Sequence, residues 1–223
     1  MRPIPYPVGP RFAADGVVAV AAAAVLGGLQ GFEGSVYAVG AMTLAAVGAW
    51  PERAAFRESQ ANRVTLFRAV LMGWAASWLG DTPPWFVVAA AALALALDGV
   101  DGWVARKTRT ETPFGGRLDM EVDAVFTVVL CLLVYLDGKA GVWVLAGGAL
   151  RYIWVLAGTG LSWLSDPLDD RFARKVCCAV EVGALIAALA LPASLAGPVC
   201  AVALLALVHS FTRDAWYLYR QAH

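Results

Sequence analysis

A succession of apolar segments constrains this chain more than any other feature of its sequence. Eight of them are long enough, or nearly long enough, to cross a membrane as helices: Gly16–Gln30, Ser35–Trp50, Val64–Gly80, Trp85–Val104, Leu118–Leu136, Val142–Leu164, Val176–Leu191 and Leu195–Tyr219. The first two are short and rich in Ala and Gly, so they are also compatible with a re-entrant or peripheral hairpin. We therefore predict an all-α, polytopic membrane bundle. Its six-helix core spans residues 62–223, after an N-terminal segment and extra helical hairpin over residues 1–61.

The composition supports a membrane protein. Hydrophobic residues make up 60% of the 223 residues, charged residues 15%, and the mean hydropathy is +0.67. A soluble domain usually carries about 25% charged residues. The formal net charge is zero, so no nucleic-acid partner is expected. The four cysteines have no metal-binding spacing and are interpreted as small apolar residues.

The basic residues of the loops indicate how the helices are oriented. With eight spans, the Arg-rich and Lys-rich loops and both chain ends fall on one side, whereas the opposite loops hold a single basic residue, Lys139. An excess of Lys and Arg marks the cytoplasmic loops of membrane proteins. Both termini are therefore predicted to be cytoplasmic, and the assignment is unchanged if residues 16–50 form a peripheral hairpin.

Four aspartates stand at the ends of two apolar segments. Asp98 and Asp101 lie at the predicted cytoplasmic end of one helix, and Asp119 and Asp123 lie at the start of the next. Residues three or four apart share a helix face, and the short connecting loop makes the helices antiparallel neighbours, so the two pairs can face each other. Converging carboxylates repel one another and lose hydration, and a divalent cation relieves both costs. Oxygen-only ligands suit Mg²⁺ or Mn²⁺, with spare positions for a phosphate.

The residues between the two aspartate pairs fit a phosphate ligand. Arg106 lies one turn beyond Asp101 and can bind phosphate oxygens as a fork, although it is also compatible with an interfacial anchor. Gly102 and Ala105 keep the helix surface thin, and Gly115 permits close approach of a ligand. The stretch therefore indicates a metal-bound diphosphate or nucleotide at the cytoplasmic membrane boundary.

This spacing resembles a known signature. The pattern Asp98-x2-Asp101-Gly102-x2-Ala105-Arg106-x8-Gly115-x3-Asp119-x3-Asp123 resembles that of the CDP-alcohol phosphotransferase (CDP-alcohol phosphatidyltransferase) family, and every signature position is occupied. NRVTLFR, at Asn62–Arg68, resembles the start of the family's first core helix, and the last six apolar segments match its six-helix core. The resemblance implies transfer of a substituted phosphate from a CDP-linked donor to an alcohol, with release of CMP. In most bacterial members the donor is CDP-diacylglycerol.

The resemblance also implies roles for individual residues. Asp98, Asp101 and Asp119 are expected to hold two divalent cations, Mg²⁺ or Mn²⁺, on the diphosphate, with Asp123 near the second. Asp123 is the expected general base that takes the proton of the acceptor hydroxyl. The residues expected to bind the donor are Gly102, Ala105, Arg106 and Gly115. The family further implies a homodimer, and the bacterial members indicate the inner membrane.

The acceptor is less well specified. TLFR is closer to members that use glycerol 3-phosphate than to those that use serine, so glycerol 3-phosphate is favoured and inositol phosphate, serine and choline stay as alternatives. An anionic acceptor needs cations near Asp123, and the candidates are Arg151, Arg174, Lys175 and Arg213. Arg151 lies inside an apolar segment, where an ionised residue is costly and suggests a functional site. It is equally compatible with a structural pair with Glu181.

The basic residues before the penultimate segment depart from the family pattern. Related enzymes carry a Gly–Lys pair where this chain has Arg174 and Lys175, and a further basic position is occupied here by Cys177. A standard phosphatidylglycerophosphate synthase is therefore in doubt. The basic residues are also compatible with a solvated loop, and Arg213 with a simple pair with Asp214.

Two other functions account for part of the sequence. A membrane prenyltransferase also uses Asp-rich metal sites, but this chain lacks a second such motif, and Arg106 and Gly115 would have no role. A cation channel or transporter needs carboxylates near the bilayer midplane, whereas these aspartates lie at predicted helix ends. Stoichiometric CMP release separates the transferase from both.

Overall fold

Helices make up the part of the chain that the structure describes. The computed structural model describes Arg68 and residues 85–108, 113–166 and 172–222. Its elements are α5 (Trp85–Thr108), α6 (Pro113–Leu136), η1 (Val142–Val144), α7 (Leu145–Gly160), η2 (Ser162–Ser165), α8 (Phe172–Ala190) and α9 (Ala193–Ala222). The prediction of an all-α bundle is confirmed over these residues. The first two predicted segments, and Val64–Gly80 apart from Arg68, lie outside them.

The helices extend further than hydropathy predicted, chiefly where the sequence is polar. α5 continues past the predicted Val104 to Thr108, and α6 begins at Pro113 rather than at Leu118. Each aspartate pair thus lies within one unbroken helix. The predicted segment Val142–Leu164 is instead divided into η1, α7 and η2. Hydropathy marks where a helix crosses apolar surroundings, so it misses polar turns that extend beyond them.

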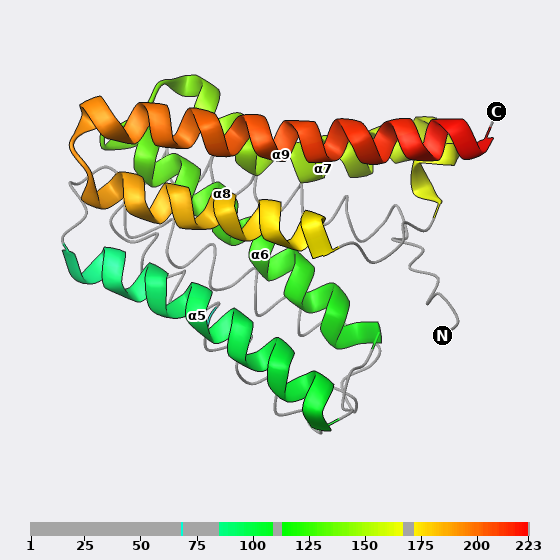
Figure 1. The fold of residues 1–223 in the computed structure, drawn as a ribbon, viewed down its shortest axis with the longest axis horizontal. Coiled ribbons are helices and arrows are strands. Elements are labelled where there is room, and N and C mark those ends of the chain that lie inside the picture. The colour runs from blue at the N-terminus through cyan, green and yellow to red at the C-terminus, as the bar shows by residue number, and fades with distance from the viewer. Residues whose placement is uncertain (1–67, 69–84, 109–112, 167–171, 223) are drawn as a thin grey trace, which may run out of the picture.

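The helices form a bundle in which α6 and α8 are central (Figure 1). α8 packs against α5, α6 and α9, while α6 also packs against α7, and α7 against α9. α5 and α9 finish, and α6 begins, at the same end of the bundle, on the right in Figure 1. We call this the aspartate end. The opposite end, on the left, is called the far end. The common core includes Ala94, Phe126, Leu130, Leu133, Leu185 and Cys200.

The turn that ends α6 lies at the far end. Gly138 has a φ of 70°, which glycine adopts without the steric cost that other residues incur. The N–H of Lys139 donates to the carbonyl of Val134, and the N–H of Gly138 donates to that of Tyr135. These two bonds form a Schellman motif, which satisfies the last carbonyls of the helix. The Lys139 Nζ also donates to the carbonyl of Leu191, 2.8 Å away, and so ties this turn to the end of α8.

α6 and α7 approach closely because glycine stands at their contact. A Cβ at Gly148 would lie 2.9 Å from Cα and from Cγ2 of Val128. A Cβ at Gly147 would lie 2.5 Å from Oε1 of Glu181 and 3.5 Å from Sγ of Cys131. Small residues at helix contacts are typical of membrane bundles, where packing drives association.

Large apolar side chains cover the outside of the bundle. Leu156, Val202 and Leu205 are each about 70% exposed. Two stretches are long and apolar enough to cross a membrane, Val142–Gly160 and Ala193–Ala222, and Trp85–Gly99 and Val122–Leu136 are shorter apolar helical stretches. An outer surface of this kind suits lipid rather than water.

Candidate functional site

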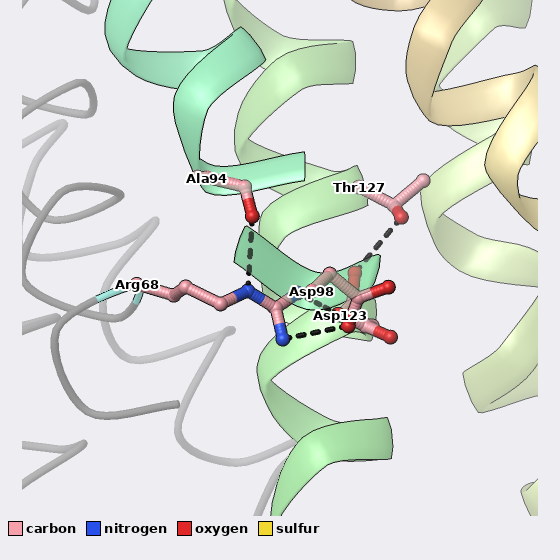
Figure 2. Close-up of polar contacts among 5 residues, drawn as sticks. All are labelled: Arg68, Ala94, Asp98, Asp123 and Thr127. Carbon is pink, nitrogen blue, oxygen red and sulfur yellow. Dashed lines mark hydrogen bonds and ion pairs between the residues drawn. The ribbon is translucent and has the colours of Figure 1, made fainter. Parts of the chain in front are cut away.

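Arg68 joins two of the predicted site aspartates (Figure 2). Its Nη1 lies 2.7 Å from Oδ1 of Asp98, on α5, and its Nη2 donates to Oδ1 of Asp123, on α6, at 2.5 Å. Its Nε donates to the carbonyl oxygen of Ala94, one turn before Asp98, at 3.1 Å. One guanidinium therefore connects a carboxylate from each helix and the α5 backbone.

The three charged groups differ in their exposure. The Arg68 side chain is 1% exposed, whereas those of Asp98 and Asp123 are 32% and 43% exposed. A buried charge is costly unless it is paired and hydrogen-bonded, and Arg68 meets both conditions. The guanidinium therefore lies behind the carboxylates, and the accessible side of the site belongs to the acids.

Local helix geometry holds Asp123 in place. It lies on the same helix as the buried Phe126 and Leu130, which anchor α6 in the core. The hydroxyl of Thr127 donates to the carbonyl of Asp123 at 2.9 Å, a bond within the same helix. The core thus fixes the α6 backbone from which Asp123 extends.

The two described aspartates suit a divalent cation. Carboxylates from two helices already converge on one cationic group, and carboxylate oxygens are the ligands that Mg²⁺ and Mn²⁺ prefer. Among the described residues, no group of three or more His, Cys, Asp or Glu side chains is placed to hold a metal ion. The side chains of Asp101 and Asp119 lie outside that part of the structure. The residues present fit the predicted metal site, and the full ligand set stays a prediction.

The predicted donor-binding residues are described only as backbone. Gly102, Ala105 and Arg106 lie in α5, and Gly115 lies in the first turn of α6. Their side-chain surroundings lie outside the described part of the structure. Their roles stay predictions.

The side chain of Arg151, a predicted acceptor residue, contacts α6 near Asp123. Its Nη1 lies 3.9 Å from Sδ of Met120, which precedes Asp123 by three residues and is its neighbour on α6. Arg151 therefore extends from α7 toward the helix that carries Asp123.

The other predicted acceptor residues lie at the aspartate end of α8 and α9. Lys175 is exposed near the start of α8, and the side chain of Arg174 lies outside the described part. Arg213 is exposed on α9, whereas the adjacent Asp214 is 2% exposed, so the two face different sides of the helix. No described contact joins these basic residues to Asp98 or Asp123.

Glu181 does not form the alternative pair with Arg151. It is 1% exposed within α8, and neither of its carboxylate oxygens has a hydrogen-bond partner among the described residues. Its carboxyl group occupies the space that Gly147 leaves free on α7. In the structure, Glu181 is a buried acid separate from Arg151.

Arg68 is the functional residue that sequence reasoning missed. From the sequence, Arg68 belongs only to a segment that resembles the start of a core helix. A signal was available, because Arg68 lies inside the apolar segment Val64–Gly80, and an ionisable residue within a membrane span suggests a functional site. Its partners could not be predicted, because they lie 30 and 55 positions further along the chain.

An apolar groove lies between α5 and α8. It has a volume of about 380 Å³ and is lined by Val88, Ala92, Leu95, Ala96, Gly183, Ile186, Ala187 and Ala190. On α5 the lining of the groove ends at Ala96, two residues before Asp98 in the sequence.

Comparison with protein families gives one match. The model of the CDP-alcohol phosphatidyltransferase family matches residues 59–212, well over half of the chain, including Arg68 and the whole aspartate stretch. No curated protein and no solved structure matches the chain. The apolar helices and the family together indicate an integral membrane protein. The chain therefore belongs to the CDP-alcohol phosphatidyltransferase family, the transferases of phospholipid synthesis that move a phosphatidyl group from a CDP-alcohol to an alcohol acceptor.

Proposed function

We propose that this enzyme transfers the phosphatidyl group of CDP-diacylglycerol to the hydroxyl of a small polar acceptor and releases CMP. Glycerol 3-phosphate is the favoured acceptor. The observation that carries the proposal is the convergence of Asp98 and Asp123, from two helices of the family signature, on one cationic group with the acids on the accessible side. Paired carboxylates at this position fit phosphoryl chemistry, in which charge must be neutralised on a diphosphate.

Divalent cations complete the proposed site. The family generally depends on them, and Asp98, Asp101, Asp119 and Asp123 would hold two Mg²⁺ or Mn²⁺ ions. Bound there, the ions would neutralise the diphosphate and stabilise the charge that develops on the CMP leaving group. Gly102, Ala105 and Gly115 would line the cytidine pocket, and Arg106 would bind the donor phosphates.

Asp123 acts as the general base in the proposed reaction. It accepts the proton of the acceptor hydroxyl as the hydroxyl oxygen forms a bond to the phosphatidyl phosphorus. The bond between that phosphorus and the bridging oxygen breaks, and the oxygen leaves with CMP. Its partial exposure supports this role, because a base must reach a substrate that enters from outside.

The apolar groove between α5 and α8 supports a lipid donor. Its lining is apolar, and on α5 it runs along the same helix that carries Asp98. A lipid whose diphosphate lay at the aspartates could place an acyl chain along this groove.

The acceptor is expected to lie on the α7 side of Asp123. Arg151 reaches the α6 surface next to Asp123, and a guanidinium there can pair with the phosphate of glycerol 3-phosphate. Arg174, Lys175 and Arg213 are further candidates. The departures at Arg174 and Cys177 keep inositol phosphate, serine and choline as alternative acceptors.

The sequence also supports a proposal for the membrane orientation, the location and the oligomeric state of the protein. The positive-inside pattern supports an active site and both termini that face the cytoplasm, and the family resemblance supports a bacterial inner membrane and a homodimer. Residues 62–223 form the proposed catalytic core, and residues 1–61 precede it.

The reaction is tested by CMP release from purified protein in lipid nanodiscs that contain CDP-diacylglycerol and Mg²⁺ or Mn²⁺. Glycerol 3-phosphate, inositol phosphate, inositol, serine, ethanolamine and choline are offered one at a time. Release with one acceptor identifies the product lipid. Asp123→Asn should abolish release, whereas the matched change Asp137→Asn, at the far end of the bundle beside Lys139, should not. Protein that binds neither metal nor cytidine nucleotide would refute the proposal.

A further inference from the structure

We propose that Arg68 is the positioning residue of the aspartate site, a fixed counter-cation that orients Asp98 and Asp123 before divalent cations bind. The inference rests on the proposed function, because it assumes that these acids are metal ligands. It concerns Arg68 itself, to which the sequence analysis assigned no role. Three contacts of one buried side chain carry it (Figure 2).

The chemistry of the guanidinium suits this role. It is planar, it stays charged at any physiological pH, and its donors form a rigid fork. Arg68 uses Nη1 for Asp98 and Nη2 for Asp123, so the fork itself sets the spacing between a carboxylate on α5 and one on α6. A lysine ammonium at this position would supply the same charge without the fork.

The third contact fixes the guanidinium relative to α5. Nε donates to the carbonyl of Ala94, which lies four residues before Asp98 on the same helix. Because the Asp98 contact and the Ala94 contact involve one helix, the guanidinium plane is held against α5. Asp123 is thereby positioned relative to α5 although it belongs to α6.

Burial separates Arg68 from the accessible side of the site. Its side chain is 1% exposed, and those of both acids are at least 32% exposed. Both of these contacts are made to Oδ1. A cation or substrate that arrives from outside meets the acids, and Arg68 stays behind them. It is therefore placed to position the acids without touching the substrate.

The charge of Arg68 has a consequence that can be measured. Without divalent cations, Arg68 supplies positive charge that offsets the two acids, which otherwise repel each other in surroundings of low dielectric constant. Arg68→Met should therefore destabilise the metal-free protein most. Mn²⁺ should restore part of the lost stability, because it supplies the missing positive charge.

The test compares Tm values of the full chain in nanodiscs, in EDTA and in saturating Mn²⁺. Arg68→Met is expected to lower Tm by about 10 °C in EDTA and by clearly less in Mn²⁺. Lys139→Met is the matched control, because Lys139 also donates to a backbone carbonyl and lies 3.8 Å from one carboxylate, Asp137. Its effect on Tm should be the same in EDTA and Mn²⁺.

Arg68→Lys provides a second, milder variant. It keeps the charge, so its Tm in EDTA should lie nearer to that of the wild type. It loses the fork, so kcat for CMP release should fall about 10-fold to 100-fold, because small displacements of reacting groups are costly. The KM for CDP-diacylglycerol should change little, since the Arg68 side chain is 1% exposed.

The outcomes separate this inference from the function on which it rests. Equal losses of Tm in EDTA and Mn²⁺ for Arg68→Met, or wild-type kcat in Arg68→Lys, would make Arg68 a purely structural residue and leave the proposed reaction intact. A wild-type protein whose Tm does not respond to Mn²⁺, and which releases no CMP, would overturn both.

Discussion

The bundle contains acids in two contrasting settings, at Asp98 and Asp123 and at Glu181. The first two come from different helices, are partly exposed and share the guanidinium of Arg68. Glu181 is 1% exposed, and among the described residues neither of its oxygens has a hydrogen-bond partner. An ionised carboxylate is very costly to bury alone, so the neutral acid is the form compatible with the Glu181 site.

The contrast shows what makes an acid in an apolar helix informative about function. Arg68 pairs with Asp98 and Asp123 and leaves both partly exposed, as a ligand site requires. Glu181 is instead 1% exposed and fills the space beside Gly147, near Cys131. We therefore assign chemistry to the acids around Arg68 and packing to Glu181.

The largest effect is expected from the loss of one carboxylate of the Arg68 pair. Asp98→Asn keeps the size of the side chain but removes a proposed metal ligand and the charge that faces Nη1 of Arg68. CMP release should fall by about 100-fold or more. The measurement is initial-rate CMP release at saturating Mn²⁺, and activity within threefold of the wild type would contradict the assignment.

A smaller effect, on stability, is expected where α6 and α7 touch. Gly148→Ala places a Cβ 2.9 Å from the Val128 backbone, so one helix must shift, at a cost of about 1–3 kcal/mol. Thermal unfolding should show a lower Tm. Gly183→Ala is the matched control, because its Cβ would meet no atom within 4 Å, and it should be neutral or stabilising by up to about 1 kcal/mol. Equal effects of the two changes would contradict the close packing.

The packing role of Glu181 predicts a coupling with Gly147. Gly147→Ala directs a Cβ to within 2.5 Å of Oε1 of Glu181. The free energy of unfolding should fall by about 1–2 kcal/mol. In a Glu181→Ala background the space is already vacated, so the same change should cost about 1 kcal/mol less. A double-mutant cycle measures this difference, and strict additivity would show that the two residues do not share the space.

The smallest effect is expected from Glu181→Gln. The amide is nearly isosteric with a neutral carboxyl group, and the main cost is one more polar group without a partner, about 1 kcal/mol. Chemical unfolding of the purified protein measures it. A loss several times larger would indicate that Glu181 has a charged partner in the folded protein.

Much of the fold could be predicted from the sequence because its signals are local. Hydropathy located α5 to α9, and the aspartate spacing gave two pairs at i, i+3 and i, i+4 within single helices. The helix ends were misjudged where polar turns such as those at Thr108 and Pro113 continue a helix beyond the apolar stretch.

The candidate site could be predicted only in part, because its decisive contacts are not local. The spacing of the aspartates identifies them, but their shared partner, Arg68, precedes them by 30 and 55 residues, and this pairing depends on how the helices pack. For the same reason the sequence could not tell whether Glu181 paired with Arg151. The proposed metal, donor and acceptor roles remain predictions.

The central claim is tested most directly by measuring CMP release for Asp123→Asn and Glu181→Gln side by side in the same nanodiscs. The account predicts a loss of about 10²-fold to 10⁴-fold for Asp123→Asn, the usual contribution of a general base, and activity within about twofold of the wild type for Glu181→Gln. Wild-type CMP release by Asp123→Asn, or its loss in Glu181→Gln alone, would contradict the account and move the chemistry away from the acids around Arg68.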